Sequence, residues 1–127
     1  MRRPDGTLFF LDFEYFGWDD PAKLISDFCW HPAMNLSGAQ KRQFASGIAE
    51  IVPDRDLLLA RLPAAHALFG LKWCTILLNE FLPHHWLRRT FAGDERSREV
   101  ALTEQLEKSR AVALRVAALH GVFPYLD

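Results

Sequence analysis

Acidic side chains gather directly behind the first apolar run of the chain. The run 8–11 is followed by Asp12 and Glu14, and Asp19 and Asp20 come a few residues later. A carboxylate at the end of a buried strand is costly unless a cation or strong donors meet it. Magnesium takes one or two carboxylates and fills its shell with water and substrate phosphates, so it suits such a position. Asp12 and Glu14, two residues apart on an extended chain, would face the same side and are candidate magnesium ligands.

The same carboxylates also have a purely structural interpretation. Asp12 would cap a turn or pair with Arg2 or Arg3, and spacing alone favours this interpretation. Helix capping fully accounts for at least one of Asp19 and Asp20. The pattern of carboxylates alone therefore leaves both interpretations open.

A turn and a short strand are expected to position the first carboxylates. Pro-Asp-Gly at residues 4–6 is typical of a turn, and the apolar residues 8–11 then favour a short buried strand. The rest of the chain is expected to be helical, with helices at about 21–30, 37–52, 54–62, 64–82 and 94–120. Asp19 or Asp20 would cap the first helix, and Ser37 would cap the second. The fold class that follows is mainly α: a short N-terminal β-strand or hairpin followed by about five helices.

Proline and apolar periodicity predict how these helices pack. Pro63 is expected to break or reset the chain between the third and fourth helices, because an interior proline removes a helical hydrogen bond. The fourth helix is apolar on most sides and is expected to run through the middle of the domain. The last helix is expected to bury one stripe, made of Leu102, Leu106, Ala113, Val116 and Ala117.

Composition restricts the class of protein. The chain has 127 residues, half of them hydrophobic, and a formal net charge of -1, which gives no field to recruit nucleic acid or an anionic membrane. We expect a single domain over residues 1–127, with a turn, strand and metal-site loop at 1–18 and a helical subdomain at 19–127. Cys29 and Cys74 lie far apart in apolar runs, which favours buried reduced thiols and a cytoplasmic protein.

The segment LFFLDFEYFGWDDPAKLISDF, residues 8–28, resembles the metal-binding strand, turn and helix of the aminoglycoside phosphotransferase and choline kinase superfamily, which has a kinase-like fold. In that family an apolar strand ends in Asp, an aromatic residue and an acid, and a glycine, an Asp-Pro pair and a helix follow. The matching residues here are Asp12, Phe13, Glu14, Gly17, Asp20 and Pro21. The chain thus resembles the C-terminal part of the large lobe.

The resemblance implies roles for several residues. Asp12 would be the counterpart of the Asp in the protein-kinase DFG motif, holding Mg²⁺ against the phosphates of ATP, with Glu14 assisting. Gly17 and Asp20 would support the turn and the helix start. The family usually has an acid where this chain has Leu24, and Asp27, on the same helical face, is a candidate to brace the catalytic loop instead.

The resemblance also implies that catalytic parts are missing from these residues. The family's catalytic loop, His-x-Asp with Asn four positions after the Asp, is expected upstream of Met1, and so is the nucleotide-binding lobe. We therefore expect the C-terminal lobe segment of an ATP-dependent phosphotransferase that acts on a hydroxyl of an aminoglycoside-, choline- or sugar-like acceptor. It is not expected to be active alone. The alternative is a non-catalytic helical interaction module or a decayed kinase lobe.

Further residues are candidates for the acceptor site by region only. Trp73 and Glu80 lie in the expected fourth helix, and His84 and His85 follow it. A solvated helix start explains the two histidines equally well. His66 is interpreted as a core or helix-end histidine. A lobe without its upstream half would expose apolar surface around the first strand, through which we expect a homodimer.

Overall fold

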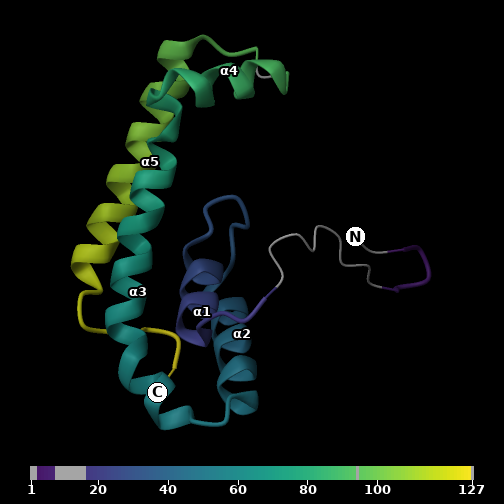
Figure 1. The fold of residues 1–127 in the computed structure, drawn as a ribbon, viewed down its shortest axis with the longest axis vertical. Helices are drawn as coiled ribbons and strands as arrows, with labels where there is room; N and C mark the ends of the chain where they lie inside the picture. Colours follow the sequence, from purple (N-terminus) through teal and green to yellow (C-terminus); the bar gives the residue numbers. More distant parts are fainter. Residues whose placement is uncertain (1–2, 8–16, 94, 127) are drawn as a thin grey trace.

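The chain is mainly helical in a computed structural model that describes residues 3–7, 17–93 and 95–126, and the strand predicted at 8–11 lies outside these ranges. Within them there is no strand, and a 3-10 turn at Asn79–Phe81 accompanies five α-helices (Figure 1). The α-helices are α1 (Pro21–Trp30), α2 (Gly38–Ile51), α3 (Arg55–Leu77), α4 (Pro83–Phe91) and α5 (Arg98–Ala118). None of the described helices combines the length and apolar character needed to cross a bilayer.

The starts of α1 and α2 confirm the capping residues predicted from the sequence. The Asp20 side chain accepts a hydrogen bond from the Ala22 backbone N–H at 2.9 Å, and Pro21 occupies the first turn. Ser37 and Gln40 form a reciprocal capping box, in which each side chain accepts from the backbone N–H of the other. Local chemistry alone defines both helix starts.

The prediction that Pro63 breaks the chain is wrong, because α3 continues through it to Leu77. An interior proline loses one backbone hydrogen bond and crowds the preceding turn. The helix keeps its course because Leu58, Leu62 and His66 lie at four-residue spacing on one face and are all buried. A break at Pro63 would separate these residues and uncover the core that they share.

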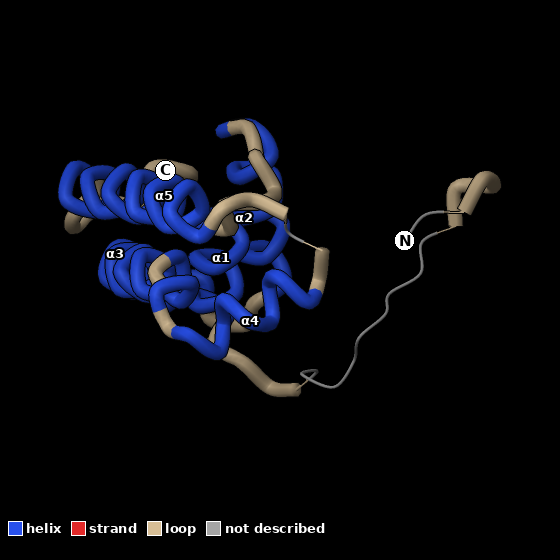
Figure 2. Tube along the Cα trace, turned by 90° about the horizontal axis from the view of Figure 1, so that it is seen from above, coloured by secondary structure: helices blue, strands red, loops and turns tan. Residues whose placement is uncertain are grey.

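The long helix α3 lies between α1 and α5 and contacts both extensively (Figures 1 and 2). It thus occupies the central position that the sequence predicted for its second half. The α1, α2 and α3 side chains form one apolar core, and α3 and α5 form a second core with Trp30 from the end of α1. The short helix α4 lies at the far end of the α3–α5 pair (Figure 1).

The stripe predicted for the last helix is also mostly wrong. The helix begins at Arg98 with Ser97 as its cap, not near residue 94. Its buried residues are Ala101, Gln105, Ser109, Val112 and Val116, so only Val116 of the predicted stripe is among them. Small and polar side chains allow α5 to approach α3 closely, and the Ser109 hydroxyl donates to the Cys74 carbonyl at 3.1 Å. The prediction assumed that the leucines would face inward.

Gly70 of α3 lies where helices approach one another closely in this core. A Cβ atom built there would lie 2.4 Å from Val116 Cγ2 and 2.9 Å from Trp30 Cε2. Both distances are too short for real carbon atoms, and the neighbours are buried ring and branched side chains that cannot swing away. Glycine is therefore required at this position for α1, α3 and α5 to meet.

We predict that Gly70→Ala lowers the free energy of unfolding by about 1–3 kcal/mol, because the added methyl group overpacks the core. Urea denaturation followed by circular dichroism measures the change. Gly47→Ala is the matched control, since a Cβ at Gly47 meets nothing within 4 Å and the residue lies inside α2. That variant should gain stability by about 0.5–1 kcal/mol. Equal stability of the two variants would contradict the close contact.

Candidate functional site

The predicted metal ligands Asp12 and Glu14 lie outside the described residues. Over residues 3–7, 17–93 and 95–126, no three His, Cys, Asp or Glu side chains come together as a metal site. The magnesium site stays a prediction from the sequence. What the structure shows is how the residues that follow the predicted site are held.

The supporting residues at the start of α1 differ in their surroundings. Gly17 has open space around the position of a Cβ atom, so packing does not demand a glycine there. Asp20 has two partners: it caps α1, and its second carboxylate oxygen pairs with the Arg61 guanidinium of α3. Asp20 thereby fixes the start of α1 against the central helix.

Asp27 is the most connected carboxylate of the predicted set. Lys72 Nζ donates to both carboxylate oxygens at 2.9 Å, and Trp73 Nε1 donates to Oδ1 at 3.1 Å. Lys23 Nζ lies 3.5 Å away on the same helix. The Asp27 side chain is 22% exposed, so water screens these contacts only in part. The group forms a polar clamp between α1 and α3. A role of Asp27 in bracing a catalytic loop stays a prediction from the sequence.

The four acceptor-site candidates fall into two separate places. Trp73 lies at the α1–α3 clamp, where its indole N–H is engaged by Asp27. Glu80 lies in the 3-10 turn and accepts from Arg89 of α4 at 2.8 Å, while its other oxygen is buried without a hydrogen bond. His84 and His85 open α4 with ring centroids 4.3 Å apart. Trp73 is therefore part of the α1–α3 contact, whereas Glu80, His84 and His85 lie together at the start of α4 and in the turn before it.

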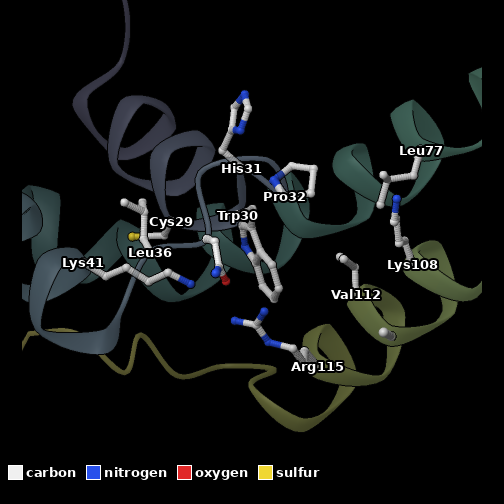
Figure 3. Close-up of a pocket in the computed structure, with 12 residues that line it drawn as sticks. Cys29, Trp30, His31, Pro32, Leu36, Lys41, Leu77, Lys108, Val112 and Arg115 are labelled. Carbon is white, nitrogen blue, oxygen red and sulfur yellow. The ribbon is translucent and has the colours of Figure 1, made fainter. Parts of the chain in front are cut away.

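Sequence reasoning missed a positively charged cavity at the junction of α1, α2 and α5. It has a volume of about 250 Å³ and contains Trp30, Lys41 and Arg115 among its lining residues (Figure 3). Lys41 is buried, although it is charged and lies in the polar first turn of α2. One signal was available: Lys41 is four and eight residues before Ala45 and Ala49, which are the other buried residues of α2.

Next to this cavity, His66 is a buried core histidine, as predicted. Its ring stacks on Trp30 at 4.6 Å between centroids and meets Phe123 edge-on at 5.1 Å. Burial is the main cause that lowers the His66 pKa from 6.5 to about 4, and the charges of Lys41 and Arg115 add to it. The imidazole is therefore neutral at physiological pH and acts as an aromatic core residue. Neither ring nitrogen has a hydrogen-bond partner in the described structure.

No family model matches the sequence, and neither a curated protein nor a solved structure is significantly similar to it. Functional inference accordingly depends on the chain's own residues. The α1–α3 clamp and the cationic cavity are polar arrangements that the fold builds from distant parts of the sequence.

We predict that Asp27→Asn lowers the free energy of unfolding by about 1–3 kcal/mol, because the Lys72 ammonium and the Trp73 N–H lose a charged acceptor. Urea denaturation is the measurement. Asp19→Asn is the control, because Asp19 pairs with Lys23 at the surface, where water screens the charges. A loss for Asp27→Asn no larger than that for Asp19→Asn would show that the clamp adds no stability.

We further predict that stability falls as the pH is lowered from about 7 to 5. The pKa of His66 is about 4 in the folded chain, and its ordinary value is 6.5. As the pH falls, the unfolded chain therefore binds a proton at His66 at a higher pH than the folded chain does. The stability that the neutral His66 ring contributes is fully present above the unfolded pKa. It is lost as the pH falls toward the folded pKa, and the free energy of unfolding drops by about 2 kcal/mol between pH 7 and 5.

Urea unfolding at several pH values measures this slope, and NMR titration of the His66 ring gives its pKa directly. His66→Phe should flatten the slope, whereas the control His120→Gln, at an exposed position after α5, should keep it. A titration midpoint near 6.5 would contradict the neutral buried ring.

Proposed function

We propose that this chain is the C-terminal lobe segment of a cytoplasmic, ATP-dependent small-molecule phosphotransferase. The enzyme would transfer phosphate to a hydroxyl of an aminoglycoside-, choline- or sugar-like acceptor. The observation that carries the proposal is the order of residues in segment 8–28, where an apolar run, Asp12, Glu14 and the Asp20–Pro21 pair precede a helix. In the structure, Asp20 and Pro21 start α1 in the way that this order requires.

The contacts of α1 with α3 support the same proposal. Asp20 pairs with Arg61, and Asp27 pairs with Lys72, so two acids of the segment are anchored on one helix. Positioning of both substrates is the main requirement of phosphoryl transfer, because the protein has little covalent chemistry to do. A helix anchored at both ends is suited to carry a metal-binding segment at its start.

The outer face of α3 is consistent with a lobe that continues beyond these residues. Leu57, Leu68 and Leu71 are 54%, 63% and 52% exposed, and Ala60 and Ala64 between them are exposed as well. Such an apolar stripe on a central helix is commonly covered by another part of the protein. We propose that the upstream part of the kinase packs against this stripe. When that part is absent, two copies of the chain would pair through the stripe as a homodimer.

Magnesium would be held by Asp12 with help from Glu14, and it would neutralise charge on the phosphates of ATP. None of the five histidines begins a His-x-Asp sequence, so the family's catalytic base has no counterpart among these residues. The proposal therefore assigns metal binding and acceptor positioning to this segment and assigns proton removal to a residue upstream of Met1.

We predict that the reading frame upstream of the Met1 codon encodes His-x-Asp-x-x-x-x-Asn shortly before Arg2. In the longer protein, Asp12→Ala should lower ADP release in the presence of acceptor at least about a hundredfold, because the charge on the phosphates is no longer neutralised. Asp19→Ala is the control and should retain most of the activity. The 127-residue chain alone should release no ADP.

Two results would overturn this proposal. The first is a stop codon immediately upstream of Met1, and the second is unchanged turnover in the Asp12→Ala enzyme. Either one would favour a helical interaction module or a decayed lobe, in which Asp12 and Glu14 have structural partners only.

A further inference from the structure

The cationic cavity is enclosed by the end of α1, the loop that follows it, α2 and α5. In Figure 3 the Lys41 ammonium and the Arg115 guanidinium extend from opposite walls into the same space beside Trp30, whereas the His31 ring points away from it. Lys108 adds a third cation to the lining, and no acid among the residues that the structure describes belongs to it. Charge of one sign therefore converges on a partly enclosed space.

The two central cations lack an acid that would balance them. Lys41 is only 8% exposed, whereas Arg115 is exposed, and neither forms an ion pair with any residue that the structure describes. Their contacts are with ring faces: Arg115 lies 4.9 Å from the Trp30 centroid, and Lys41 Nζ lies 5.4 Å from that of Tyr125. Bringing a lysine this far out of water beside a second cation is costly without an anion.

Nearby groups respond to this charge. Lys41 and Arg115 both contribute to lowering the pKa of His66, after burial, and Lys41 opposes the burial that raises the pKa of the Cys29 thiol to about 11. The positive potential thus extends through the wall of the cavity into the core.

We propose that this cavity binds a small organic anion, whose carboxylate or phosphate group lies between Lys41 Nζ and the Arg115 guanidinium. Its apolar part would lie against Trp30 and Val112. The planar guanidinium offers paired donors that match either oxyanion, and the cation–π contact with Trp30 holds it in place. Binding here does not depend on the phosphotransferase function, because it involves neither Asp12 nor a nucleotide.

The size and surroundings of the cavity define the ligand class. A volume of about 250 Å³ is slightly below the range of sites for drug-sized ligands, so the ligand is small. Its wall provides apolar contacts from Leu36, Leu77 and Val112 and one neutral amide from Asn35, whose φ of 45° is in the left-handed region. Such a lining suits an anion with a compact apolar body.

Separate titrations with inorganic phosphate and with benzoate test the proposal, with the Trp30 indole resonance followed by ¹H–¹⁵N NMR. The resonance is assigned with Trp30→Phe. We expect a saturable shift, and we expect Lys41→Met or Arg115→Gln to weaken binding about tenfold or more. Arg42→Gln and Arg110→Gln, at exposed positions on the same two helices, are the matched controls and should bind like the original chain.

The two probes distinguish the ligand classes. Tighter binding of phosphate identifies a phosphate monoester as the ligand class, and tighter binding of benzoate identifies an aromatic carboxylate. No saturable shift with either probe would overturn the proposal. It would equally be overturned if Lys41→Met and Arg42→Gln bound with the same affinity.

Thermal unfolding provides a second measurement. Lys41→Met should unfold at the same or a higher temperature than the original chain without added anion, because it removes an unbalanced buried cation. The preferred anion should raise the unfolding temperature of the original chain and leave that of Lys41→Met unchanged. Asp127 lies outside the described residues, so the titrations also include Asp127→Asn, which tests whether this carboxylate pairs with the cations of the cavity. Binding that appears only in Asp127→Asn would overturn the proposal, since the cations would then pair with the chain's own acid.

Discussion

The packing of Trp30 against α3 is the contact on which the rest of the structure depends. Its indole N–H donates to the His66 carbonyl at 2.8 Å, its ring stacks on the His66 ring, and its edge lies against the bare backbone of Gly70. A large side chain at the end of α1 can enter the α3–α5 core only because Gly70 leaves room for it. The Arg115 guanidinium lies over the same indole, 4.9 Å from the ring centroid, so a single aromatic residue joins the core to the cationic cavity.

Features with local causes could be read from the sequence, and features with distant causes could not. The cap at Ser37 and a cap at Asp19 or Asp20 were predicted correctly because capping involves residues only a few positions apart, and the structure selects Asp20. Pro63 was misjudged because the local cost of proline is offset by core contacts that exist only in the folded chain. The inward face of α5 was misjudged for a related reason, since close approach to α3 selects small side chains over leucines.

The same division applies to the candidate site. Asp27 was named from the sequence as a candidate supporting acid on the first helix, but its partners Lys72 and Trp73 are 45 and 46 residues away. The cationic cavity is still less visible, because Lys41 and Arg115 come from helices with α3 and α4 between them in the chain. Periodicity identifies Lys41 as an inward-facing position, yet only the fold shows that a second cation shares its space.

A net charge of -1 conceals how the charges are arranged. Where α1 meets α3, the capping acid and the acid within α1 each have a basic partner: Asp20 pairs with Arg61 and Asp27 with Lys72. Lys41 and Arg115, on the α2 and α5 side, have no such partner among the described residues. The fold thus neutralises the charges that join its helices and leaves two cations unbalanced beside a cavity. Because an unbalanced buried charge costs stability, the burial of Lys41 is better explained by an anion that binds there than by packing.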